Sequence, residues 1–111
     1  MNIKFSSDAV RCRATHAEFE SLLAGRAISL EVALPRNHAF KASVRPAPVG
    51  GWLLDSDPTG LWIAIPRAAL ESLAEKLPSK EGISNRFEMG GKGSVAVSFE
   101  VDVRKSDEVM V

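Results

Sequence analysis

The stretch from Gly51 to Leu77 constrains the fold more than any other part of the chain, because two apolar runs flank a proline turn and an amphipathic helix follows. In the turn, Asp55 to Gly60, the proline presets φ and the glycine can adopt the left-handed conformation at the exit. The run from Leu61 to Ile65 has no polar residue, which predicts a strand covered on both faces. Beyond it, apolar residues recur at helical spacing, at Leu70, Leu73, Ala74 and Leu77. The stretch therefore predicts a β-hairpin that leads into a helix packed against it.

Alternating apolar and polar residues predict further short strands on both sides of this stretch. They cover residues 3–5, 10–14, 27–34 and 40–44 before it, and residues 83–89 and 95–103 after it. Short turns join most successive strands, so we expect these to pair antiparallel. The run Thr15-His-Ala-Glu18 has the spacing of a capping box and predicts the start of a second helix, which Gly25 would end.

These elements predict one α+β domain over residues 1–111, in which residues 105–111 form a loose tail. A chain of this length can bury one core but not two. The order of the elements predicts a strongly twisted antiparallel sheet of about six to eight short strands, which could be barrel-like, with two helices on one side or end. We find no internal repeat in the sequence.

The charge balance bears on the kinds of partner that the chain can have. Fourteen basic and fourteen acidic residues cancel, so no bulk charge favours nucleic acid or an anionic membrane, and self-association is unopposed. We expect a homodimer, with another protein or a small anionic ligand as further partner, and neither nucleic acid nor a membrane. Cys12 is the only cysteine, which suits a buried thiol in a reducing compartment. Without a signal peptide or a transmembrane run, the sequence predicts a cytoplasmic protein.

Two segments of the chain carry a resemblance to a known family. They are Met1-x-Ile-Lys with Ala9-Val-Arg-Cys-Arg13-Ala-Thr15-x-x-Glu18-x-x-x-Leu22, and Ile63-Ala-Ile-Pro-Arg67. These segments resemble a family of short bacterial proteins of unknown function, which open with a strand, an Arg-x-Arg pair and a capped helix. The last strand departs from the family pattern, since Val101 stands where a lysine would be expected and no Cys or His follows. The resemblance implies the fold outline and a bacterial cytosolic setting, and it implies no activity.

Four charged residues are the candidates for a ligand site. Arg11 and Arg13 share one face of a predicted strand, as do Glu100 and Asp102, because side-chain direction repeats every two residues. If these strands pair, the arginines face the acids across a solvated sheet surface, which is the interpretation that we favour. The other interpretation is an inward-facing pocket in which the arginines bind a phosphate or carboxylate and the acids hold a metal ion.

The two tryptophans are the candidates for an interface. Trp52 and Trp62 lie on neighbouring strands of the central hairpin, either in the core or in an exposed apolar patch between subunits. We favour the core, since each ring buries a large area, and an outward position would indicate a dimer.

We predict a non-catalytic binding or accessory module that self-associates. Neither His16 nor His38 has a carboxylate at ligand spacing, so we predict no metal site, no cofactor and no catalytic residue. The alternative is a hydrolase-type enzyme that binds a phosphorylated ligand and a divalent ion through the four charged residues. The direction in which those side chains point separates the two hypotheses.

Overall fold

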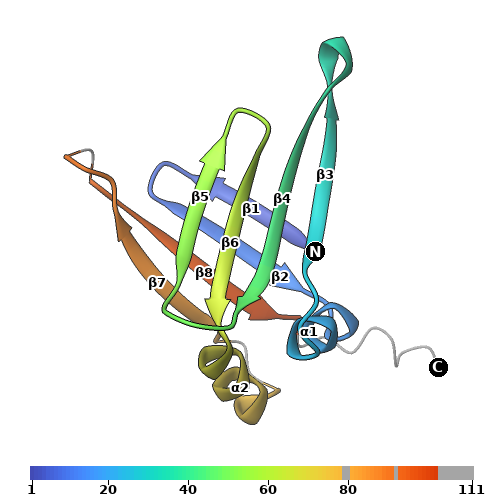
Figure 1. The fold of residues 1–111 in the computed structure, drawn as a ribbon, viewed down its shortest axis with the longest axis vertical. Helices are drawn as coiled ribbons and strands as arrows, with labels where there is room; N and C mark the ends of the chain where they lie inside the picture. Colours follow the sequence, from blue (N-terminus) through green and yellow to red (C-terminus); the bar gives the residue numbers. More distant parts are fainter. Residues whose placement is uncertain (79–80, 92, 103–111) are drawn as a thin grey trace.

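The computed structural model describes residues 1–78, 81–91 and 93–102, which form two four-stranded sheets with two helices at one end (Figure 1). In chain order the elements are β1 (Asn2–Ser6), β2 (Ala9–Ala14), α1 (His16–Leu23), β3 (Ile28–Leu34), a 3-10 turn (Pro35–Asn37), β4 (His38–Ala47), β5 (Leu53–Asp57), β6 (Gly60–Pro66), α2 (Arg67–Lys76), β7 (Ile83–Glu88) and β8 (Ser94–Val101). The predicted α+β class is confirmed. The tail predicted at 105–111 lies outside the described residues.

The strands do not form the single antiparallel sheet that we predicted. Sheet A has the order β1-β2-β8-β7 and sheet B the order β3-β4-β6-β5. The two outer pairs of each sheet are antiparallel hairpins, whereas the central pairs, β2 with β8 and β4 with β6, are parallel. Short turns specify only the hairpins, and the central pairs join strands that are separated by at least a further strand in the chain. Neither sheet closes on itself, so the barrel-like form is not found.

The order of elements repeats in the two halves of the chain. Each half consists of a hairpin, a helix and a second hairpin, first β1 to β4 with α1 and then β5 to β8 with α2. Each sheet takes one hairpin from each half, so the parallel pair β2–β8 is the counterpart of the pair β6–β4 (Figure 1). This internal pseudo-symmetry corrects the expectation that the chain contains no repeat.

Backbone hydrogen bonds show which residues of the two halves are equivalent. The amide of Ala96 donates to the carbonyl of Asp8 at 3.0 Å, and the amide of Lys41 donates to the carbonyl of Thr59 at the same distance. Asp8 and Thr59 each precede the second strand of a hairpin, so β2 corresponds to β6 and β8 to β4, residue by residue. Short matches in sequence accompany this, namely Glu20-Ser-Leu22 with Glu71-Ser-Leu73 and Ile28-Ser29 with Ile83-Ser84.

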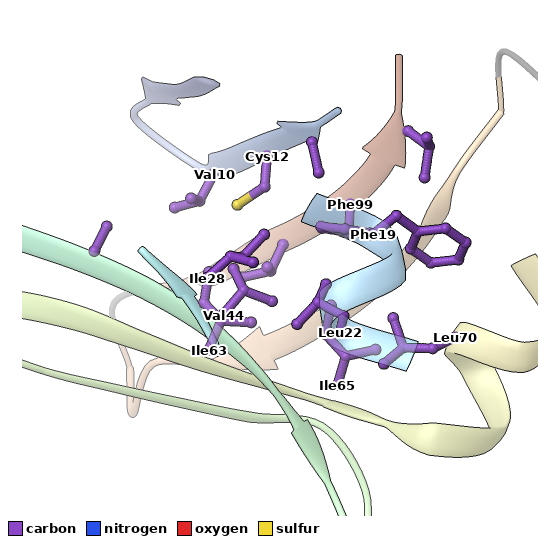
Figure 2. Packing of buried hydrophobic residues seen from close by; sticks show 14 of the residues in the cluster. Val10, Cys12, Phe19, Leu22, Ile28, Val44, Ile63, Ile65, Leu70 and Phe99 are labelled. Carbon is purple, nitrogen blue, oxygen red and sulfur yellow. The ribbon is translucent and has the colours of Figure 1, made fainter. Parts of the chain in front are cut away.

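One core lies between the inner faces of the two sheets and the helices (Figure 2). Each strand turns alternate residues inward, and the helices contribute the apolar faces that the sequence predicts. The largest fully buried side chains are Phe99, Leu22, Ile63, Ile65, Leu70, Leu73, Val44 and Val97. Phe19 of α1 and Phe99 of β8 pack with ring centroids 6.2 Å apart. The two sheets are therefore held together by burial of apolar surface rather than by strand pairing.

The predicted capping box fixes the start of α1. The Thr15 hydroxyl accepts from the amide of Glu18 at 3.1 Å, and the Glu18 carboxylate accepts from the amide of Thr15 at 2.9 Å. The same carboxylate also binds the amino group of Met1 at 2.7 Å, so it ties the start of β1 to the helix. Gly25, with φ +93°, follows the helix as predicted.

Candidate binding surface

Arg13 and Glu100 meet on the outer face of sheet A. They are register partners on the parallel strands β2 and β8, and Nε of Arg13 donates to Oε2 of Glu100 at 2.7 Å. The Arg13 side chain is 47% exposed and that of Glu100 is 23% exposed. This pair is a cross-strand ion pair on a solvated face, of the kind that the favoured interpretation describes.

The other two candidates, Arg11 and Asp102, are not register partners of each other. Arg11 is exposed on the same face, and its register partner on β8 is Ser98. The first of the two acids, Glu100, lies two residues farther along β8, opposite Arg13. Asp102 follows the end of β8, where its amide donates to the carbonyl of Ala14 at 2.8 Å. Arg11, Arg13 and Glu100, with Asn2, Lys4 and Cys12, line a hollow of only about 30 Å³, which we call the Arg13 hollow.

The two tryptophans occupy different environments. Trp52 lies just before β5 and packs against the core, as we predicted for both residues. Trp62 is half-buried on β6, where its register partners are Ser43 on one side and Asp55 on the other. Its neighbours in sequence, Leu61 and Ile63, point into the core, so alternation turns Trp62 to the outer face of sheet B. The prediction that it lies in the core is wrong for Trp62.

Trp62 lines a hollow on the outer face of sheet B that is larger than the Arg13 hollow. Its volume is about 360 Å³, and we call it the Trp62 hollow. It is lined by Arg45, Leu53, Leu54, Asp55, Trp62, Ile63 and Ala64, from β4, β5 and β6. Leu53 is 56% exposed, so the hollow offers apolar surface to solvent.

The two hollows lie at equivalent places in the two halves of the chain. Arg11 corresponds to Trp62 and Arg13 to Ala64, because Ala9 corresponds to Gly60. In sheet A, the long Arg13 side chain lies on the outer face beside Glu100, on the two central strands β2 and β8. In sheet B, the same place holds the single methyl group of Ala64. This difference in side-chain length explains why one hollow is nearly filled and the other open.

The charges around the two hollows are also exchanged. Lys4 and Glu100 beside the Arg13 hollow correspond to Asp55 and Arg45 beside the Trp62 hollow. Within the part of the chain that the structure describes, Arg45 makes no ion pair. The Trp62 hollow thus combines an aromatic ring, an aliphatic wall and two opposite charges that are available to a ligand.

Hydrogen bonds shape the turn next to this hollow. The Asp57 carboxylate accepts from the hydroxyl of Thr59 at 2.6 Å and from its amide at 2.7 Å. These bonds hold the pKa of Asp57 below its usual range. The turn keeps the end of β5 paired with β6, the strand that carries Trp62.

Two further features bear on chemistry, namely the grouping of possible metal ligands and the environment of Cys12. Among residues 1–78, 81–91 and 93–102, no three His, Cys, Asp or Glu side chains are grouped so that they could hold a metal ion. Cys12 is 2% exposed, as predicted, and burial raises the pKa of its thiol to about 11. Its sulfur points into the core (Figure 2), away from the solvent that a nucleophilic thiol must reach.

Several residues of the Trp62 hollow were not candidates from the sequence. From the sequence, Arg45, Leu53 and Ala64 are not singled out, and Asp55 is predicted to lie in the turn rather than in a strand. The usable signal is the reversal of side-chain direction at each residue of a strand, which puts Leu53, Asp55 and Trp62 on one face once the register of β5 and β6 is known. The sequence predicts the hairpin but not its register, and the apolar run through β6 does not indicate which face is outer.

No family model, no curated protein and no solved structure matches the chain. In the described part of the chain, no helix combines the length and apolar character needed to cross a membrane.

Proposed function

We propose that this protein is a non-catalytic binding module of the cytosol that self-associates and holds a segment of a partner protein in the Trp62 hollow. The observation that carries the proposal is the position of Trp62, half-buried on the outer face of sheet B, where it lines a hollow of about 360 Å³ together with Arg45 and Asp55. Pockets that bind small groups commonly have volumes of about 300–1,000 Å³. The single buried Cys12 supports a reducing compartment.

The chemistry of the hollow favours a segment with an apolar side chain between an acidic and a basic residue. Tryptophan and arginine dominate the energetic centres of protein interfaces, because each gives a large contact area and a directional polar group. An apolar side chain would cover the Trp62 ring and the Leu53 wall. The acidic residue of the segment would pair with Arg45 and the basic residue with Asp55. The hollow should therefore prefer one order of the two charges along the segment, as well as a certain composition.

The hydrolase alternative has less support. It needs Arg11, Arg13, Glu100 and Asp102 to converge around a ligand. Arg13 and Glu100 instead neutralise each other on an exposed face, and Asp102 is not among the residues that line the Arg13 hollow. The volume of that hollow, about 30 Å³, is close to the space of one water molecule.

Tryptophan fluorescence tests the proposal directly. In a Trp52→Phe variant, Trp62 is the only fluorophore of its kind. The probes are capped tripeptides with a central leucine between glutamate and lysine, in both orders, and matched peptides with central alanine or with serine flanks. We expect a saturable change in emission with a charged leucine peptide, a preference for one order, and weaker responses to the matched peptides.

Two variants serve as controls. Trp62→Phe in the native Trp52 background should lose affinity, which isothermal titration measures without fluorescence. Arg11→Ala alters the equivalent position in sheet A and should leave binding unchanged. If no peptide binds, or if Arg11→Ala weakens binding as much as Trp62→Phe, the Trp62 hollow is not the binding site.

A further inference from the structure

The strand β3 is an edge of sheet B, and its outer half carries apolar side chains that the rest of the described chain leaves exposed. Val32 is 47% exposed and Leu34 is 45% exposed. β6 begins to pair with β4 only at Lys41, so β3 and β4 continue beyond the sheet as a two-stranded arm (Figure 1). Exposed, apolar edge strands are templates for pairing with another chain.

The four edge strands differ in how well they resist such pairing. β3 is the longest, with seven residues, and Glu31 is its only charged residue. The other edges are shorter and carry Lys4 in β1, Asp55 and Asp57 in β5, and Arg86 and Glu88 in β7. The comparison with β7 is the most direct, because β7 is the pseudo-symmetric counterpart of β3. Charged residues and a short strand both oppose association at an edge. β5 and β7 each carry two charges, and β1, which like β3 carries one, has only five residues, so β3 is the edge that is most open to a partner.

We infer that the β3 edge is a homodimer interface, in which β3 of a second copy adds antiparallel and joins the two copies of sheet B into one continuous sheet. The inference names a surface for the proposed self-association and rests on that part of the proposed function. It does not involve the Trp62 hollow, which lies on the face of sheet B rather than at this edge.

The sequence of β3 selects one register for this pairing. With the two-fold axis at Val32, each Leu30 faces Leu34 of the second copy, and each Glu31 faces Ala33 of the second copy. Both apolar pairs then extend the inner face of the sheet, and no like charges stand opposite each other. The ladder ends where Pro35 interrupts the strand.

The neighbouring register is less favourable. With the axis at Glu31, two glutamates would stand opposite each other, which is destabilising. It would also bring Leu34 of the second copy opposite Ile28, which is buried where β3 contacts α1. In the Val32 register, Glu31 keeps Lys41 as its cross-strand neighbour within its own chain, and the zero net charge does not oppose association.

Cysteine cross-linking tests the register. Val32→Cys places two thiols opposite each other across the two-fold axis, whereas Ala33→Cys places its thiol opposite Glu31. Under mild oxidation we expect a disulfide-linked dimer with Val32→Cys and much less with Ala33→Cys. The native chain, whose Cys12 is buried, is the control for oxidation itself. Equal cross-linking at both positions would overturn the register, and none at either would overturn the interface.

A charge introduced at the edge tests the interface in solution. Ala33→Glu places a second carboxylate on β3, and Ser84→Glu places one at an exposed position on β7. By analytical ultracentrifugation we expect a dimer for the native chain and for Ser84→Glu, and at least about tenfold weaker association for Ala33→Glu. A monomeric native chain, or an Ala33→Glu dimer as tight as the native one, would overturn the inference.

The same variants separate this inference from the Trp62 proposal. Trp62→Phe should leave the dimer intact, and Ala33→Glu should still bind the charged leucine peptide. Loss of the dimer in Trp62→Phe would move the subunit interface to the face of sheet B and overturn the β3 interface. If the native chain is a dimer but does not bind the peptide, the Trp62 hollow is not a binding site, and the β3 interface is unaffected by that result.

Discussion

Arg13 and Ala64 occupy equivalent positions on the outer faces of the two sheets, and the length of the side chain at this position separates a filled hollow from an open one. The Arg13 guanidinium is tied to Glu100 at 2.7 Å, so it stays over its own sheet. In sheet B the equivalent residue is Ala64, whose methyl group is itself buried, and Arg45 and Leu53 line the larger hollow beside it. The pseudo-symmetry therefore supplies two similar surfaces, of which one is open to a ligand.

The Arg13–Glu100 pair should contribute little to stability and nothing to ligand binding. We expect Glu100→Ala to lower the free energy of unfolding by less than about 1 kcal/mol, because exposed ion pairs are screened by water and salt. Glu88→Ala, an exposed acid on β7 without this partner, is the matched control in urea denaturation.

Thermal shift with phosphate, pyrophosphate and Mg²⁺ tests the hydrolase alternative at the same residues. A ligand at a hundred times its dissociation constant would add about 2.7 kcal/mol of stability. We expect no shift with any of these ligands. A shift in the native protein that disappears in Arg13→Ala would establish an anion site at the Arg13 hollow and favour the alternative.

Replacing Glu18 should change how stability depends on pH. Burial alone would raise the pKa of Glu18, but bonds from the Met1 amino group and Thr15 outweigh it and hold the pKa below the ordinary value of 4.5. A lowered folded pKa stabilises the fold above the unfolded value, and this is lost as pH falls through the folded pKa. Glu18→Gln should therefore cost about 1 kcal/mol near neutral pH, and the difference from the native chain should shrink below about pH 4.5.

Urea denaturation over a pH series measures this difference. Glu20→Gln makes the same change on the same helix, at an exposed residue outside the capping box, and should show no such trend. A Glu18→Gln deficit that stays constant down to acidic pH would contradict the role given to the carboxylate.

Gly60 should not tolerate a side chain, although its equivalent residue in sheet A is Ala9. A Cβ at Gly60 would clash with the carbonyl oxygen of Lys41, a backbone atom that cannot move without disturbing the parallel pair. We expect Gly60→Ala to cost about 1–3 kcal/mol in chemical denaturation. Ala9→Gly, the reverse change, should cost only about 0.5–1 kcal/mol. A stabilised Gly60→Ala variant would show that β4 and β6 lie farther apart.

The Cys12 thiol should be unreactive while the protein is folded. Its pKa of about 11 leaves almost no thiolate at mildly alkaline pH, and its side chain lies in the core. We expect a thiol reagent to label the folded protein very slowly and the unfolded protein at one thiol per chain. Rapid labelling under native conditions would contradict the placement of β2 against sheet B.

The local elements could be predicted from the sequence because their signals are local. The Thr15–Glu18 box, the proline turn before Gly60 and the alternation in β8 each depend on neighbouring residues. The pairing of β2 with β8 has no such signal, since it joins residues that are far apart in the chain. Equivalent positions such as Arg11 and Trp62, or Arg13 and Ala64, share neither size nor charge, and the sequence matches between the halves are only two or three residues long, so the repeat becomes clear only from the order of elements and the hydrogen-bond register.

The candidate site was predicted in part for the same reason. Arg13 and Glu100 do meet, because both face outward on strands that pair. The core is predicted for Trp62 because its ring can bury a large area, and the apolar run around it gives no indication of which face is covered. Its outward position follows from the packing of Leu61 and Ile63 on the other side of β6.

Binding at the Trp62 hollow is tested most directly by the chemical shifts of the tryptophan indole N–H groups in ¹⁵N-labelled protein, as the charged leucine peptide is added. We expect the Trp62 signal to move progressively with peptide concentration, while the Trp52 signal and the Nε–H signals of Arg11 and Arg13 stay in place. Movement of the arginine signals with an unchanged Trp62 signal would place the ligand on sheet A and exclude the Trp62 hollow as the binding site.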